Sequence, residues 1–122
     1  MKYLCLVYLE EKRLAEVPDE HCVDFDTAIR DSGHCIASEA LESVRTAKTV
    51  RVRGDKVSIT DGPFAETKEQ LAGFYLIEAR DPSEAAELAA RIPPARVGSI
   101  EVRPIRPIRE AVRAFQAGRG RG

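Results

Sequence analysis

Two segments of the chain are apolar on both of their alternating faces, and they constrain the fold more than any other feature. They are residues 3–9 (YLCLVYL) and residues 71–80 (LAGFYLIEAR). A strand that is apolar on both faces is typical of the middle of a sheet. Each of these segments is followed by a stretch in which apolar residues have helical spacing. Two such strand–helix units in 122 residues predict a single α+β domain.

The two helices have their own start and stop signals. The first is predicted over residues 18–33, where a proline and an aspartate open the helical pattern. The second has the clearer start, because Asp81 is a good N-cap, Pro82 suits the first helical position and Glu84 completes a capping box. It ends at Pro93-Pro94, since neither proline has a backbone N–H to donate.

Among the remaining segments, those that alternate predict strands at the edges of the sheet. Residues 49–53 and 56–60 alternate around Gly54-Asp55 and predict a hairpin, residues 34–41 predict an extended piece, and residues 99–105 alternate as an edge strand does. The order is β-α-β-β-α-β with an added hairpin. It predicts an antiparallel, ferredoxin-like α+β sandwich, with the two doubly apolar strands in the centre.

Both helices are expected on one face of this sheet, and nothing in the sequence covers the other face. A bare apolar face of that size is usually an interface, so we predict a homodimer packed sheet to sheet. The domain is predicted to cover residues 1–108. Residues 109–122 form an Arg-rich tail, for which we expect a short helix near residues 110–116 and then disorder.

The charges are divided unevenly along the chain. Residues 1–102 contain 13 Lys and Arg against 19 Asp and Glu, a net charge of −6, whereas residues 103–122 contain six arginines and Glu110, a net charge of +5. The tail lacks interleaved aromatic residues for base stacking, so a solvated tail, able to dock on an acidic body or partner, is favoured over nucleic-acid binding. The sequence has no apolar run long enough to span a membrane and no signal peptide. It has three cysteines, an odd number that argues against a framework of disulfides. A cytoplasmic protein with reduced thiols is therefore expected.

The sequence contains two His-Cys pairs, His21-Cys22 and His34-Cys35, and histidine and cysteine are the residue types that commonly bind zinc. The predicted helix between them separates the pairs by about 20 Å, so no metal site is predicted. A Cys-His nucleophile lacks an orienting third group and an oxyanion loop, so Cys5 and Cys22 are expected to be core thiols.

The segment DGPFAETKE, residues 61–69, has the densest cluster of ionisable groups. In a structural interpretation, Asp61 caps backbone N–H groups and Phe64 anchors the turn to the core. In a functional interpretation, Asp61 and Glu66 line a cleft and Lys68 binds an anionic or phenolic group. The residues alone leave both interpretations open.

Four strings of the sequence carry a resemblance to a known family: MKYLCLVYLEE at the start, DGPFAETKEQLAGFYLIEARD, EAAELAARIP and GSIEVRPI. With these strings the chain resembles the DGPF branch of the YCII-related proteins. The resemblance extends to Pro107 and implies a dimeric ferredoxin-like α/β-barrel fold. The resemblance also implies that the chain is one of a group of small bacterial proteins whose functions are mostly undetermined. Some proteins of this group are encoded beside sigma factors or fused to them. A distant member of the family is a dehydrochlorinase.

Another branch of the family uses a His in the first helix and an Asp after the second helix as an acid/base pair. Here those positions fall on Cys22 and near Ile92-Pro93, so this pair is not carried over. The motif residues that carry over are Asp61, Phe64, Glu66, Lys68 and Glu69, with Gly62 and Pro63 fixing the turn. Tyr75 and Arg103 are expected at the same cleft.

The resemblance therefore implies a small-molecule-binding or accessory protein with a cleft at the DGPF loop. The alternatives are a cofactor-free acid/base enzyme and a partner-binding module linked to a sigma factor. The enzyme would act on a small aromatic or lactone-like compound with Asp61 or Glu66 as base. Its ligand-binding residues would be Phe64, Lys68, Glu69, Tyr75 and Arg103.

Overall fold

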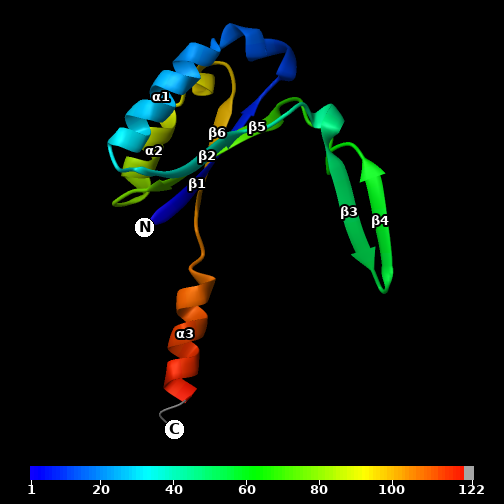
Figure 1. Cartoon of the computed structure of the whole chain (residues 1–122), viewed down its shortest axis with the longest axis vertical. Coiled ribbons are helices and arrows are strands. Elements are labelled where there is room, and N and C mark those ends of the chain that lie inside the picture. Colours follow the sequence, from blue (N-terminus) through cyan, green and yellow to red (C-terminus); the bar gives the residue numbers. More distant parts are fainter. Residues whose placement is uncertain (120–122) are drawn as a thin grey trace.

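The computed structural model describes residues 1–119 and is an α+β fold of ferredoxin-like order. One antiparallel four-stranded sheet has the order β2-β5-β1-β6, and two helices lie together on one side of it (Figure 1). The sheet is open and does not close into a barrel within the protomer. In chain order the elements are β1 (Lys2–Leu9), the 3-10 turn η1 (Glu11–Glu16), α1 (Asp19–Asp31), β2 (Cys35–Ala40), η2 (Val44–Thr46), β3 (Lys48–Arg53), β4 (Lys56–Asp61), β5 (Gln70–Glu78), α2 (Pro82–Ala90), η3 (Pro93–Arg96), β6 (Ser99–Pro104) and α3 (Ile108–Arg119).

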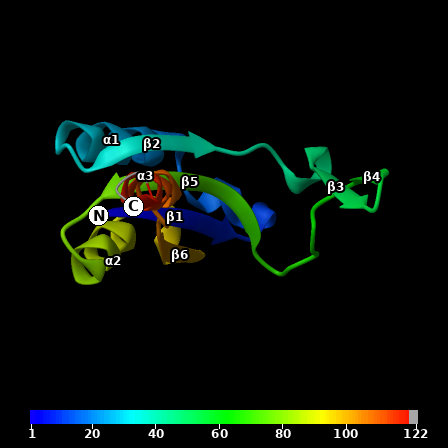
Figure 2. The ribbon, with the colours of Figure 1, turned by 90° about the horizontal axis from the view of Figure 1, so that it is seen from below.

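The two doubly apolar segments are the central strands β1 and β5, as predicted. The last strand, β6, is an edge, as its alternation indicated. The hairpin was wrongly expected to supply an edge of the same sheet. Instead β2 pairs with β5, through partners such as Ser38 and Tyr75, and so occupies that edge. The hairpin strands β3 and β4 pair with each other as a separate two-stranded sheet, which lies apart from the main sheet in Figure 2.

Helix α2 begins at the predicted N-cap. Oδ1 of Asp81 accepts a hydrogen bond from the Glu84 N–H at 2.8 Å, which satisfies a backbone donor that has no partner within the helix. The Glu84 carboxylate turns back to the N–H of Arg80, at 2.8 Å, one residue before the position that a capping box uses. The cap therefore fixes the β5–α2 connection on both sides of Asp81.

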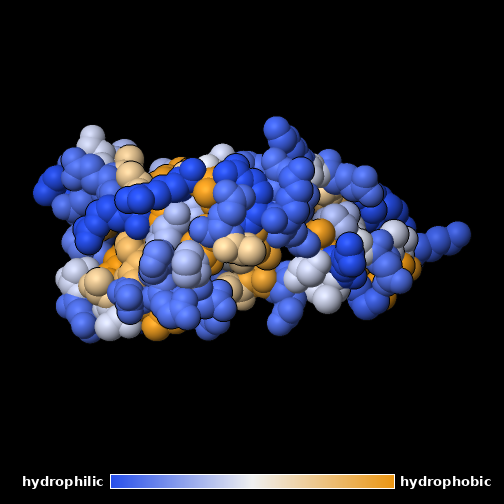
Figure 3. All heavy atoms as spheres, turned by 90° about the horizontal axis from the view of Figure 1, so that it is seen from above, coloured by the Kyte–Doolittle hydropathy of each residue, from blue (hydrophilic) through white to orange (hydrophobic). Residues whose placement is uncertain are grey.

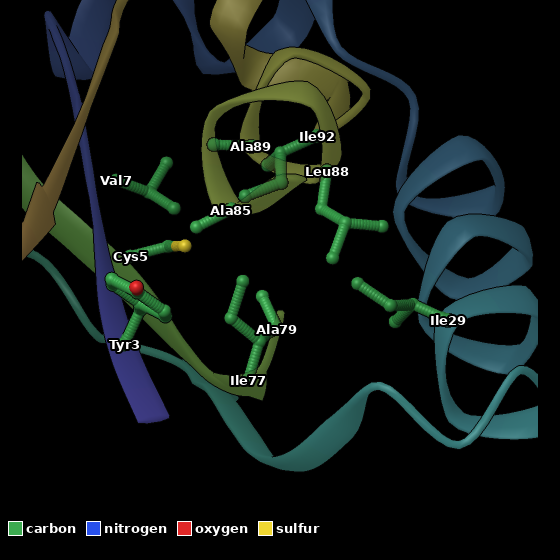
Figure 4. Close-up of a cluster of buried hydrophobic side chains, with 10 residues drawn as sticks. All are labelled: Tyr3, Cys5, Val7, Ile29, Ile77, Ala79, Ala85, Leu88, Ala89 and Ile92. Carbon is green, nitrogen blue, oxygen red and sulfur yellow. The ribbon is translucent and has the colours of Figure 1, made fainter. Parts of the chain in front are cut away.

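The core lies between the sheet and the helices. Figure 4 shows side chains of β1 and β5 directed toward the apolar stripe of α2, with Ile29 of α1 closing the cluster on the other side. The apolar residues Ala85, Leu88 and Ala89 of α2 are buried. The residues of this cluster are Tyr3, Cys5, Val7, Ile29, Ile77, Ala79, Ala85, Leu88, Ala89 and Ile92.

The opposite face of the sheet has no covering layer within residues 1–119. Because Tyr3, Cys5 and Val7 point into the core, their alternates on β1 point to the open face. These alternates are partly exposed and pair with apolar residues of β5. The open face thus carries Leu4, Leu6, Tyr8, Phe74 and Leu76.

The hairpin β3–β4 and the helix α3 both project from the body (Figure 1). Gly62, just after β4, has φ of +107°, a conformation that glycine adopts most readily, and it turns the chain at the base of the hairpin. Helix α3 is longer than the short helix predicted near residues 110–116, and the last residues, 120–122, lie outside the described part of the chain. No helix in residues 1–119 has both the length and the apolar character needed to cross a membrane.

Candidate functional site

A largely apolar pocket of about 340 Å³ lies between α1 and the sheet. Its floor comes from the central strands β1 and β5, and its walls come from α1, β2 and the 3-10 turns. This volume lies within the range of small-molecule sites, and apolar walls with a few polar groups are their usual composition. The lining residues are Val7, Leu9, Leu14, Val17, Asp19, Cys22, Val23, Asp26, Ser38, Glu39, Ala40, Ala72, Gly73, Tyr75 and Pro94.

One wall of this pocket is polar. The Ser38 hydroxyl donates a short hydrogen bond to Oδ1 of Asp26, and Nε of Arg30 donates to Oδ2 at 2.8 Å. Arg30 also donates to the Ser38 hydroxyl oxygen at 2.7 Å. Burial raises the pKa of Asp26, but the bonds from Ser38 and Arg30 outweigh it and hold the pKa below its usual value. Asp26 is therefore an anion fixed in place at neutral pH.

Tyr75 is on the floor of the pocket, with its ring edge-on to Phe25 at a centroid distance of 5.4 Å. Its ring is thereby held in one orientation. Burial, followed by the nearby Cys22 and Asp26, raises the pKa of Tyr75 to about 12. Within residues 1–119 its hydroxyl has no hydrogen-bond partner, so this neutral phenol is available to a ligand.

Cys22 lines the pocket but is not an activated thiol. Burial and the negative charge of Asp19 raise the pKa of Cys22, and burial raises the pKa of the core residue Cys5 to about 11. A raised pKa disfavours the thiolate, which is the nucleophilic form. Cys5 is a core thiol as predicted, whereas Cys22 is only half-buried and belongs to the pocket. Residues 1–119 contain no group of three or more His, Cys, Asp and Glu that could hold a metal ion.

The DGPF segment lies outside this pocket. Asp61 ends β4, and its side chain, 86% exposed, accepts a hydrogen bond from Nζ of Lys48 at 2.6 Å. Phe64 is 80% exposed, with the guanidinium of Arg51 5.9 Å from its ring centre. The structural interpretation, in which Asp61 caps backbone groups and Phe64 reaches the core, is therefore wrong.

The later residues of the segment lie at a second, shallower groove. Nζ of Lys68 is 4.0 Å from the Glu10 carboxylate, and the Glu69 carboxylate accepts a hydrogen bond from the Ser99 hydroxyl at 2.8 Å. This groove is also lined by Tyr8, Arg13, Thr67, Ile100 and Glu101. Glu66 is exposed and does not line it. Within one protomer the motif residues are therefore divided between the hairpin and the groove.

Tyr75 and Arg103 were expected at one cleft, and the protomer separates them. Tyr75 pairs with Cys5 and faces the helices, whereas Arg103 pairs with Leu4, whose side chain points to the open face. Arg103 donates a hydrogen bond to Glu101 there, at 3.4 Å. Because Cys5 and Leu4 are neighbours on β1 and point to opposite faces, Tyr75 and Arg103 lie on opposite faces of the sheet.

Sequence analysis missed Asp26 and Ser38. The spacing of Asp26 and Arg30 by four residues indicates an ion pair on one side of a helix, but such pairs are common on surfaces. Ser38 lies in a segment whose pairing depends on β5, which is distant in the sequence. Only the sheet register places the two residues at one pocket.

Comparison with known proteins decides the family. Residues 1–109 match the YCII-related domain, nearly the whole described chain. The chain belongs to the YCII-related family. A segment of 67 residues is 48% identical to an uncharacterised protein, R00369, of Rhizobium meliloti strain 1021. This match covers 53% of the chain and 54% of that protein, so the chain spans about half the length of this relative. In this YCII-related protein the match runs through β6 and ends within the first turn of α3.

Proposed function

We propose that this YCII-related protein binds a small, neutral and mainly apolar molecule in the pocket beneath α1. The observation that carries the proposal is the Tyr75 hydroxyl, a neutral group on the floor of an apolar pocket. A ligand oxygen could accept a hydrogen bond from it. Asp19, Asp26 and Glu39 also line the pocket, and their carboxylates disfavour an anionic ligand. A small aromatic or lactone-like compound fits these requirements.

A titration with coumarin, a neutral aromatic lactone, tests this proposal. Ala72→Leu places a larger side chain in the pocket and should weaken binding at least tenfold. Tyr75→Phe removes one neutral hydrogen bond, worth about 1 kcal/mol, and should weaken binding about fivefold. The control is Phe64→Ser, which changes the exposed DGPF loop and should leave binding unchanged. Weakening by Phe64→Ser alone would move the site to the DGPF loop and overturn the proposal.

We also propose that the protein is a homodimer packed through the open face of the sheet. The support is the row of partly exposed apolar residues on β1 and β5, since a continuous apolar face of this kind is typical of an interface. Sedimentation velocity at micromolar concentration should give the mass of two chains, and a single-chain mass would contradict the proposal.

Catalysis by Asp61 or Glu66 is the alternative function. Both side chains are exposed, and Asp61 is paired with Lys48, so neither lies in an enclosed site that would hold a substrate against it. The geometry therefore favours binding over this chemistry. An accessory role beside a sigma factor is a further prediction, and co-purification of a sigma factor from the source cell would support it.

A further inference from the structure

Helix α3 carries an apolar stripe that no other part of residues 1–119 covers. Ile108, Ala111, Val112 and Phe115 have the spacing i, i+3, i+4, i+7, so they share one side of the helix. All are exposed, Phe115 at 65%. Figure 1 shows the helix extending away from the body, at the end opposite α1 and α2. The match to the YCII-related domain ends at residue 109, so Ala111, Val112 and Phe115 lie beyond the matched residues.

A helix of this length needs a partner. Isolated helices shorter than about 12–15 residues are marginal in water, and most helical stability in proteins comes from packing of an amphipathic face. Helix α3 has 12 residues and buries none of them. Its stripe must therefore be covered by another surface for the helix to be stable.

Charge complementarity indicates what that surface is. Residues 103–119 contain five arginines and Glu110, a net charge of +4, whereas residues 1–102 have a net charge of −6. On the same helix, Arg109 and Arg113 lie one turn apart, and Arg109 neighbours Val112 of the stripe. An acidic protein surface is the natural partner, and a second copy of this chain provides one.

The most suitable acceptor on the second copy is the mouth of the pocket beneath α1. Val23, 61% exposed, and Leu14, 51% exposed, offer apolar contact there, and both line the pocket. Asp19 beside them offers a carboxylate to the arginines. The helix layer that carries α1 is largely hydrophilic on its outer surface, with apolar side chains visible only in patches (Figure 3). A helix with an apolar stripe and a basic flank complements such a mouth.

The length of α3 suits this arrangement. Twelve residues span about 18 Å at 1.5 Å per residue. Packed sheets lie about 10 Å apart, and a helix layer lies about as far again beyond them. The length of α3 is therefore close to the distance from one sheet of a sheet-to-sheet dimer to the helix layer of the partner.

We propose that α3 of one copy docks its apolar stripe over the mouth of the α1 pocket in a second copy. The helix thereby covers a pocket that its own chain leaves open. The docking site is the same pocket as in the proposed function, and the inference rests on that function only in treating α3 as a cover for the ligand site. Docking of α3 does not require a ligand, so docking and ligand binding are measured separately.

The experiment compares two full-length double variants. Val112→Ser with Phe115→Ser changes the stripe, and Ala114→Ser with Ala117→Ser changes the other side of the same helix. Valine, phenylalanine and serine have similar helix propensities, whereas alanine is a better helix former, so the control weakens the isolated helix at least as much. Sedimentation should show the dissociation constant for self-association raised at least tenfold by the stripe change and unaltered by the control.

A fluorescent reporter tests the location. The chain contains no tryptophan, so Val23→Trp provides a single one at the acceptor. Its emission should move to longer wavelength when the stripe is changed, and should not move with the control. Equal dissociation constants for the two double variants would overturn the inference, and so would an unchanged emission. Flotation of the full chain with phosphatidylserine vesicles, lost only in the stripe variant while self-association stays the same, would assign α3 to a membrane surface and overturn it as well.

Failure of this inference is distinguishable from failure of the proposed function. Coumarin binding by the stripe variant reports on the pocket alone, because that variant keeps every pocket residue. Binding that persists when docking is lost would leave the proposed function intact.

Discussion

The Ser38 hydroxyl on β2 donates a hydrogen bond to the Asp26 carboxylate on α1, and this contact joins the helix to the edge strand at the polar wall of the pocket. Arg30 completes the arrangement by donating to both side chains. An edge strand has only one strand neighbour, so a side-chain contact to the helix above it also restrains its position. The same three residues therefore shape the pocket and hold β2.

The charge of Asp26 should appear in the acid stability of the protein. Its pKa is lowered in the folded state, so it contributes stability above the unfolded-state pKa of about 4, and this contribution is lost as the pH falls through the lower folded-state pKa. Asp26→Asn should therefore be less stable than the wild type at pH 7, and the difference should shrink between pH 4 and pH 2. Urea unfolding followed by circular dichroism across this range measures it. A constant difference at every pH would contradict the assignment.

The raised pKa of Tyr75 predicts that the protein loses stability at alkaline pH. Its pKa is about 12 in the folded state and near 10 in the unfolded chain, so the folded state retains a proton that the unfolded state has lost. Stability should therefore fall as the pH rises from 10 toward 12. Tyr75→Phe should show a shallower fall over this range in thermal unfolding. The fall due to Cys5, whose folded-state pKa is about 11, should remain in the variant and serves as an internal reference.

Gly98 is required by a close approach of two backbone segments. A Cβ at this position would overlap the carbonyl oxygen of Tyr8 and would lie 2.8 Å from the Cβ of Leu9. Gly98→Ala should lower the free energy of unfolding by roughly 3 kcal/mol, because β6 must move away from β1. Gly118→Ala is the matched control, since a Cβ there meets no atom within 4 Å, and it should change the free energy by less than about 1 kcal/mol. Similar effects of the two changes would be evidence against this close approach.

The ion pair between Asp61 and Lys48 should contribute little to stability. Both side chains are largely exposed, and pairs of this kind are typically worth less than about 1 kcal/mol. Asp61→Asn should therefore change the free energy of unfolding by less than about 1 kcal/mol in a denaturant titration, and added salt should reduce the difference further. A loss above about 2 kcal/mol would show that the DGPF loop has a structural role after all.

The sequence predicted the fold well because its strongest signals are local or are set by burial. The doubly apolar segments became β1 and β5, and Asp81 caps α2 because a capping bond spans only three residues. Strand pairing is not a local property. The alternation of residues 49–60 predicted edge strands, and only the structure reveals that β2 occupies that edge.

The candidate site could be predicted only in part for the same reason. Asp61 and Phe64 were singled out by their place in a motif, but the hairpin carries them away from the pocket in the protomer. Asp26, Ser38 and Tyr75 are widely spaced along the chain, and each belongs to a different element. Their meeting depends on the register of β2 against β5 and on the packing of α1 above it. A single sequence does not determine either of these.

The central position of β1 also has a consequence for biosynthesis. Cys5 on this strand faces Tyr75 on one neighbour and Val102 on the other. Both neighbours are synthesised after β1, so β1 finds them only when nearly the whole domain has followed it. Until then an apolar strand of high β-propensity has no partner, and the many non-local pairings make closure slow. Nascent chains stalled before β6 should therefore depend on chaperones, and this dependence should disappear once Pro104 has emerged.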